Sequence, residues 1–135
     1  MSIEMNPALT EKFLEPFNTF FGGGEIWLYE GEKPSVDNDD WNAFGTYLGF
    51  IILPEVPFST TSTGSFVKNG EWMGYRNNST GTPNWFRMVD STYNTYWIDG
   101  DITLTGGGGE LQFPSLNIHT NAQINVETAT FQFTY

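Results

Sequence analysis

Apolar and polar residues alternate over short stretches along most of the chain, which predicts β-strands separated by turns. After Gly24 the apolar stretches are rich in Val, Ile, Tyr, Phe and Trp, and the segments between them are rich in Gly, Pro, Asn and Ser. The expected strands lie at 25–31, 46–53, 71–76, 85–90, 96–105, 110–113, 116–119 and 124–135, with a weak strand in 58–70. The alternation shifts at Thr128–Ala129, as a β-bulge would cause. The pattern predicts an all-β fold, a jelly-roll-like antiparallel β-sandwich.

The N-terminus carries the one helical pattern. Asn6 suits the N-cap and Pro7 the first turn, and apolar residues then recur at helical spacing, at Leu9, Phe13, Leu14 and Phe17. Pro16 limits the expected helix to about two turns, because proline has no N–H and its ring obstructs the preceding turn. The sequence FFGGGE at 20–25 predicts a hinge. We therefore expect a short N-terminal helical arm with a Gly hinge at 1–24, followed by a β-sandwich domain at 25–135.

Two interpretations of this helix remain open at the level of sequence. It either covers one end of the sheet core, or it is an arm that docks on a neighbouring subunit. The aromatic content exceeds what one small core needs, so some aromatic side chains of the helix are expected to be buried between chains. The candidate residues for this contact with another copy or another protein are Phe13, Phe17, Phe20 and Phe21.

Composition and charge narrow the classes of partner. Aromatic residues make up 17% of the 135 residues and there are 15 glycines, so bulky rings supply core volume while glycines supply tight turns. The formal net charge of -11 disfavours nucleic acids and anionic membranes, since both need clustered Lys and Arg. A basic protein surface remains a suitable partner.

The sequence also bears on cellular location. There is no cysteine, which excludes disulfides and thiolate chemistry. The first residues lack the basic and apolar regions of a secretory signal, and the longest apolar run, FIIL, is too short to span a bilayer. We expect a protein that is made in the cytoplasm of a host and stays soluble there at first.

Catalytic chemistry finds little support. His119 is the only histidine, and its position at a strand end favours a surface role. Asp99 and Asp101 share a strand face, but acids at i and i+2 are more typical of a solvated face than of a glycosidase pair. The acidic loop VDNDDWN lacks the central glycine of a calcium loop, because Asn42 stands there. We expect no enzyme activity, no cofactor and no metal.

Carbohydrate binding, in which aromatic side chains stack on sugar rings, is an alternative function that the aromatic content leaves open. Five tryptophans are available, at Trp27, Trp41, Trp72, Trp85 and Trp97. Most are needed for the core of so small a domain. Trp41 is the candidate exposed aromatic residue, because it lies in the acidic loop.

Several short motifs follow one another along the chain. IWLYEGEKP comes first, and the pattern GT-x-x-WFR is matched at Gly81, Thr82, Trp85, Phe86 and Arg87. Next come the segment Ile98–Gly100, a Gly-rich turn with Gly108, Glu110 and Leu111, and a closing hairpin with Ile118, Ile124, Val126 and Phe131. The order of these motifs resembles that of small virion structural proteins of tailed bacteriophages. The resemblance spans about 26–135, and the segment 36–79 departs from it.

The resemblance implies a non-enzymatic part of a virion. A small acidic β-sandwich looks most like a capsid cement, or decoration, protein that binds between subunits of the major capsid protein. A tail or neck component and a carbohydrate-binding β-sandwich module are the alternatives. Because symmetry axes of a capsid present repeated surfaces, a homo-dimer or homo-trimer is expected.

Arg87 is expected to form a structural ion pair. It stands in an aromatic strand of a chain with only 5 Lys and Arg. Its neighbouring strand supplies Asp99 and Asp101, and a guanidinium–carboxylate pair fixes direction as well as attraction. Whether the pairing lies within one chain or between chains remains open in the sequence.

Overall fold

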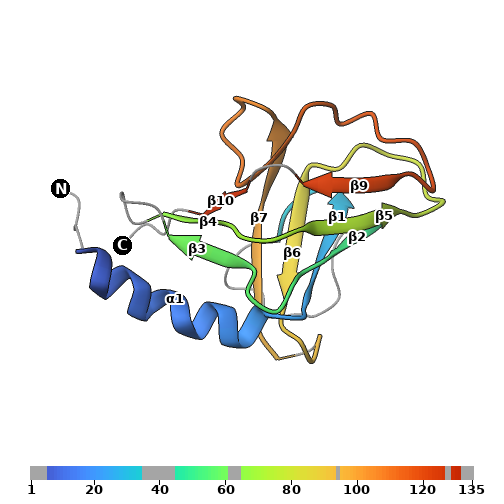
Figure 1. The fold of residues 1–135 in the computed structure, drawn as a ribbon. Coiled ribbons are helices and arrows are strands. Elements are labelled where there is room, and N and C mark those ends of the chain that lie inside the picture. Colours follow the sequence, from blue (N-terminus) through green and yellow to red (C-terminus); the bar gives the residue numbers. More distant parts are fainter. Residues whose placement is uncertain (1–5, 35–44, 61–64, 94, 127–128, 132–135) are drawn as a thin grey trace.

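A computed structural model describes residues 6–34, 45–60, 65–93, 95–126 and 129–131, which form one helix and ten strands (Figure 1). The elements are α1 (Pro7–Phe21), β1 (Glu25–Glu30), β2 (Thr46–Ile52), β3 (Phe58–Thr60), β4 (Phe66–Lys68), β5 (Trp72–Arg76), β6 (Trp85–Val89), β7 (Trp97–Leu104), β8 (Leu111–Phe113), β9 (Gln123–Val126) and β10 (Thr130–Phe131). The prediction of an all-β chain with one N-terminal helix is confirmed.

Seven strands form one strongly curled sheet in the order β8-β7-β6-β1-β2-β5-β9. Its two end strands, β8 and β9, lie in contact. Leu111 of β8 also forms a bridge with Ala129, the residue before β10, and the Thr130 N–H donates to the Glu110 carbonyl at 3.2 Å. The sheet is therefore a nearly closed barrel. Its pairs are antiparallel except β7–β8, which is parallel and departs from the antiparallel pattern expected from the sequence. A smaller sheet, β10-β4-β3, completes the fold.

Two glycines allow the sheet to curl where β2 meets β5. Gly49 has φ +151°, and a Cβ there would overlap the Tyr75 carbonyl. A Cβ at Gly74 would overlap the Phe50 carbonyl. The register between β1 and β2 also shifts between Leu28 and Tyr29, which adds local twist. The two backbones thus approach closely where β2 pairs with β5.

The core fills the inside of the curled sheet and the space between the two sheets. Aromatic rings join the sheets, because Phe58 of β3 packs edge-on against Trp72 of β5 at 5.4 Å, and Phe131 of β10 lies 5.7 Å from Phe86 of β6. Trp72 also donates its indole N–H to the Pro57 carbonyl at 3.2 Å. The smaller sheet is therefore held by ring contacts as well as by backbone pairing.

Helix α1 is longer than the sequence predicts. It runs for 15 residues through Pro16, so the expectation of about two turns is wrong. Asn6 caps it, as expected, by accepting the Leu9 N–H at 2.8 Å. The turn beyond Pro16 is retained because Phe17 and Phe21 pack on the core, and this packing offsets the backbone hydrogen bond that proline cannot make.

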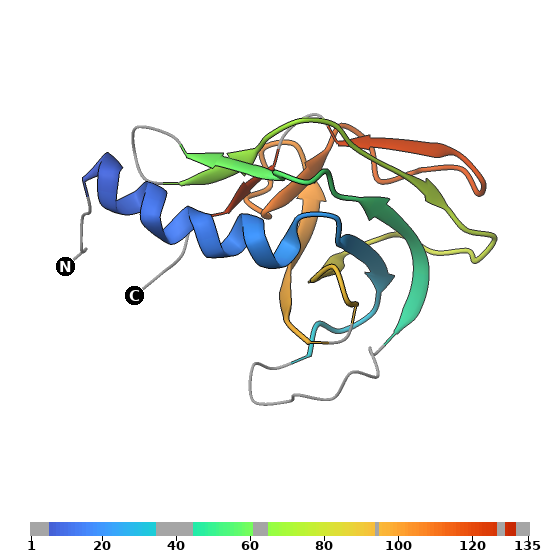
Figure 2. The same cartoon turned by 60° about the horizontal axis from the view of Figure 1, so that its bottom comes forward.

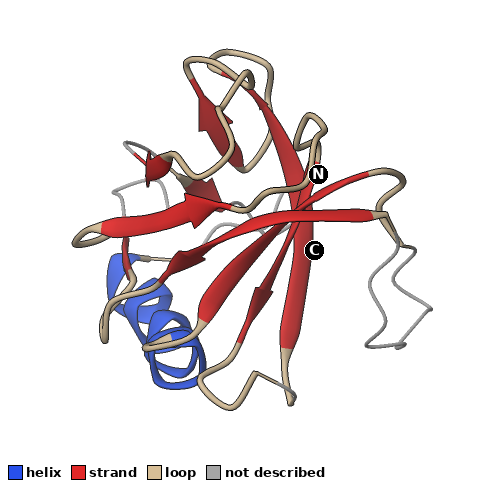
Figure 3. Cartoon of the chain, turned by 90° about the vertical axis from the view of Figure 1, so that its right-hand side faces the viewer, coloured by secondary structure: helices blue, strands red, loops and turns tan. Residues whose placement is uncertain are grey.

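The helix lies along β3 at one side of the strands, as Figures 2 and 3 show from two directions. The Asn18 side chain forms two hydrogen bonds with the backbone of Phe58, donating to its carbonyl at 3.1 Å and accepting from its N–H at 3.0 Å. The connection at Gly22–Gly24 is fixed too, because the Gly23 N–H donates to the Pro54 carbonyl. The C-terminal half of the helix is therefore part of the domain.

Most expected strands are present, but 116–119 is not a strand. Its carbonyl at Ile118 accepts from the buried Arg76 guanidinium at 3.3 Å, so a side chain takes the place of a neighbouring strand. The weak strand in 58–70 forms two short strands, β3 and β4. Thr128, at the expected bulge, lies outside the described residues.

Asp90 organises the connection between β6 and β7, where the sequence predicts a turn. Its buried carboxylate accepts from the hydroxyl and N–H of Thr92 and from the N–H groups of Thr95 and Tyr96. Burial alone would raise the pKa of Asp90, but these hydrogen bonds outweigh it and lower the pKa. The ionised form is therefore favoured by folding.

We predict that Asp90→Asn lowers the free energy of unfolding at pH 7 by about 1–3 kcal/mol, because the amide cannot accept all four hydrogen bonds. The Asp90 pKa is lower in the folded chain, so the stabilisation is complete above the unfolded pKa of about 4 and is lost as pH falls through the folded pKa. Urea titrations at several pH values should show the two chains converging in stability below about pH 4. Asp101→Asn, at an exposed position, is the control, and an equal loss there would contradict the assignment.

Candidate functional site: the exposed face of helix α1 and its groove

Helix α1 carries two apolar faces, and only one of them is covered by the chain itself. Leu14, Phe17 and Phe21 pack on the core, and Phe21 is 4% exposed. The other face holds four residues that lie within a narrow arc at 100° per residue, namely Leu9, Phe13, Pro16 and Phe20. We call these four the helix stripe. Leu9, Phe13 and Phe20 are 47%, 48% and 42% exposed, so three large apolar side chains on one helix face are open to solvent.

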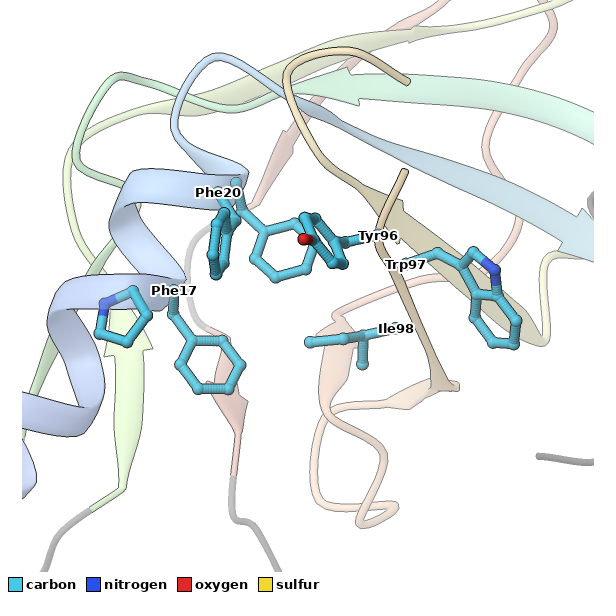
Figure 4. A pocket seen from close by; sticks show the side chains of 7 residues that line it. Phe17, Phe20, Tyr96, Trp97 and Ile98 are labelled. Atoms are coloured by element: carbon cyan, nitrogen blue, oxygen red, sulfur yellow. The ribbon is translucent and has the colours of Figure 1, made fainter. Parts of the chain in front are cut away.

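A groove with a volume of about 360 Å³ opens at the C-terminal end of the stripe. Its lining residues are Pro16, Phe17, Phe20, Phe21, Tyr96, Trp97 and Ile98. Figure 4 shows Phe17 and Phe20 reaching in from the helix and Ile98 from the opposite strand, with Tyr96 beside Phe20. The Phe20 and Tyr96 rings are 4.7 Å apart, and the Ser91 N–H donates to the Phe20 carbonyl, which ties the helix end to the β6–β7 connection.

The groove suits an apolar side chain. All seven lining residues are aromatic or aliphatic, so the walls favour an aliphatic or aromatic group of a partner over a charged one. The Tyr96 side chain is 49% exposed at the rim. Chemically the site can bind and position a partner but offers no nucleophile or general base.

The ring of Trp97 turns away from the groove in Figure 4 and lies instead over Arg87, whose guanidinium carbon is 4.3 Å from the ring centroid. Arg87 makes a two-pronged ion pair with Asp99, with Nε–Oδ1 at 2.8 Å and Nη2–Oδ2 at 3.0 Å. The side chains of Arg87 and Asp99 are 0% and 9% exposed. The ion pair between Arg87 and Asp99 thus lies within one chain. Asp99 is in β7, the strand whose residue Ile98 lines the groove opposite the helix.

Asp101 has a different partner from Asp99. It lies on the same strand face, as expected, but pairs with Lys33 at 2.9 Å, where the two side chains are 53% and 38% exposed. Each aspartate therefore has its own cation. The arrangement is that of two structural ion pairs, one buried and one on the surface.

The structure separates the four aromatic residues expected to contact another chain. Phe13 and Phe20 are on the exposed stripe, whereas Phe21 belongs to the core and Phe17 packs edge-on against Phe66 at 5.1 Å. Trp41 lies outside the described residues. The sequence reasoning missed Tyr96 and Ile98, because nothing in the local pattern shows that the β6–β7 turn lies beside the helix end.

His119 is exposed in the turn before β9, and within the described residues no group of three His, Cys, Asp or Glu side chains could hold a metal ion. Across those same residues, no helix is long and apolar enough to cross a membrane.

Comparisons with known proteins give no match to a family model, to a curated protein or to a solved structure.

We predict that Arg87→Met lowers the free energy of unfolding by about 3–5 kcal/mol, because it leaves the Asp99 carboxylate without its cation. The double variant Arg87→Met/Asp99→Leu should recover most of this loss, since no charge is then left without its counterion. Denaturant unfolding of the wild-type chain, the single variants Arg87→Met and Asp99→Leu and the double variant measures the coupling. Lys33→Met, which breaks the exposed pair, should cost about 1 kcal/mol or less. A double variant as unstable as the single one would show that the pair is not the reason for the loss.

Proposed function

We propose that this protein is a non-enzymatic structural protein that joins a larger protein assembly through the helix stripe and the adjoining groove. One observation carries the proposal. A helix whose C-terminal half is fixed to the domain presents Leu9, Phe13 and Phe20 to solvent, next to an apolar groove. Exposing these side chains in a monomer is unfavourable, and a partner surface that covers them removes the cost.

The assembly we propose is a phage virion. The support is the collinear order of motifs that resembles small virion proteins, together with an acidic chain suited to a basic protein surface. The most suitable role is that of a capsid cement or decoration protein bound between subunits of the major capsid protein. A tail or neck position is the alternative within the same class. The finer description of the fold, a jelly-roll-like sandwich, is also a proposal, supported by the aromatic contacts between the two sheets.

Self-association is the second part of the proposal. A dimer or trimer would place several copies of the stripe on one particle, and avidity would then strengthen individually weak contacts. The stripe and groove are complementary in character, because one offers exposed rings and the other an apolar recess. A ring from one copy is therefore a suitable occupant for the groove of the next.

We predict that the double variant Phe13→Ser/Phe20→Ser remains folded but binds its assembly at least ~10-fold more weakly, because exposed aromatic anchors supply much of the affinity of an interface. Co-sedimentation with shells of the accompanying major capsid protein measures binding, and analytical ultracentrifugation measures self-association. Thr19→Ser, an exposed polar position on the same helix, is the matched control.

Phe86→Leu separates binding from folding, because Phe86 is fully buried and belongs to neither the helix stripe nor the groove. It removes a ring that packs on Phe131 within the chain, so it should lower the free energy of unfolding by about 1–3 kcal/mol and leave shell binding of the folded protein unchanged. Shell binding that survives Phe13→Ser/Phe20→Ser unchanged would contradict the proposed surface. Binding to tail components but not to shells would move the proposal to the tail, and binding to glycans alone would replace it with a carbohydrate-binding function.

A further inference from the structure

A second apolar surface lies on the outer face of the barrel, away from the helix stripe. Side chains of directly paired residues share a sheet face, so the register places Trp27 of β1, Phe50 of β2, Tyr75 of β5 and Gln123 of β9 in one row. The next row holds Glu25, Ile52, Met73 and Asn125. The alternate residues, such as Ile26 and Ile51, are buried in the core, so both rows point outward.

Five side chains of these rows form what we call the outer patch, namely Trp27, Phe50, Ile52, Met73 and Tyr75. Ile52 and Tyr75 are 51% and 52% exposed, and the other three are half-buried. The Trp27 indole N–H donates to the Glu25 carboxylate at 3.0 Å, so its one polar group already has a partner. An outward sheet face normally alternates polar residues with buried ones, and here apolar residues take the polar positions on three adjacent strands.

Acidic side chains surround one end of this patch. β1 begins, β2 ends and β5 begins at the same end of the sheet, where Glu25, Glu55 and Glu71 are placed. Glu55 and Glu71 are exposed. The chain's five Lys and Arg lie elsewhere or are occupied. Arg76 and Arg87 are buried, Lys12 pairs with Glu15, Lys33 pairs with Asp101, and Lys68 belongs to the smaller sheet.

The geometry points to the outer patch as a docking surface for a protein partner that presents apolar side chains bordered by Lys or Arg. Aromatic residues and Met are enriched at protein interfaces, and the acidic border selects a basic partner by charge complementarity. This surface is additional to the helix stripe, so the protein has two faces and can bridge two neighbours.

Two other occupants fit less well. The Lys and Arg side chains of a second copy are buried or lie away from its own outer patch, so a second copy offers no cation to Glu25, Glu55 and Glu71. A sugar ring needs a flat platform, but the Phe50 and Tyr75 rings are inclined at 53° with centroids 6.2 Å apart. The side chains of Ile52 and Met73 supply no hydrogen bonds to the hydroxyl groups of a sugar. Side chains of a protein partner can interdigitate with the inclined rings, so they fit the uneven surface of the outer patch better than a sugar ring does.

The test compares two short peptides of equal apolar content, one alternating Leu with Lys and the other Leu with Glu, added to the full-length protein. Methyl NMR follows Ile52 and Met73, which report directly on the patch. The Leu/Lys peptide should shift both signals saturably, and raising the salt from about 0.05 M to about 0.3 M should weaken the binding. The Leu/Glu peptide should leave the signals unchanged.

Variants assign the effect to the patch. Ile52→Ser and Tyr75→Ser, at exposed positions, should each weaken Leu/Lys binding by ~10-fold. Glu55→Gln/Glu71→Gln should remove much of its salt dependence, whereas the same charge change on the helix, Glu11→Gln/Glu15→Gln, should not. Phe13→Ser/Phe20→Ser should bind the peptide normally, which separates this surface from the one proposed above.

Several results would overturn the inference. Equal binding of both peptides, or shifts confined to residues outside the patch, would exclude a site selective for basic partners. Self-association that Ile52→Ser abolishes would assign the patch to a second copy instead. Shifts of Ile52 and Met73 on addition of a cello-oligosaccharide, without any response to the Leu/Lys peptide, would assign it to glycans.

Discussion

The two hydrogen bonds between the Asn18 side chain and the backbone of Phe58 fix the rotation of helix α1 about its axis. Because one amide both donates and accepts, only one rotation of the helix satisfies the pair. That rotation directs Phe17 and Phe21 into the core and leaves Phe13 and Phe20 exposed. The exposed stripe, the groove beside it and the proposed function all follow from this one docking geometry.

The helix is held against the two sheets by core packing and by the Asn18 hydrogen bonds. The end strands of the barrel, β8 and β9, lie in contact, β8 also forms a bridge with Ala129 beside β10, and α1 lies along β3. Within the described residues these contacts cover strand edges, which favours association through side chains over pairing of strands. Apolar side chains are exposed on two separate surfaces, the helix stripe and the outer patch. The excess of acids over bases, 16 against 5, then favours basic protein surfaces as partners for both.

Local patterns were sufficient to predict most of the strands, though not that 116–119 lacks a strand, and the direction of several side chains. The short turn between them gave β6 and β7 as neighbours, and period-two geometry placed Asp99 and Asp101 on one face beside Arg87. The choice of Asp99 as partner depends on register, since Arg87 and Asp99 are directly opposite. The length of α1 was predicted wrongly because tertiary packing of Phe17 and Phe21 outweighs the local effect of Pro16. The groove was not predictable, because Tyr96 and Ile98 are distant from α1 in the sequence. Only the way the sheet curls brings them beside the end of the helix.

Photo-crosslinking within the assembled particle tests the central claim most directly. A photo-reactive phenylalanine analogue would replace Phe13 in one preparation and Leu104 in another. If the helix stripe is the joining surface, position 13 should crosslink to a second polypeptide, and the attached peptide should identify the partner subunit. Position 104, which is 50% exposed but lies on neither the helix stripe, the groove nor the outer patch, should give no crosslink to another chain. A position 13 that forms no crosslink to another chain in assembled particles would contradict the account.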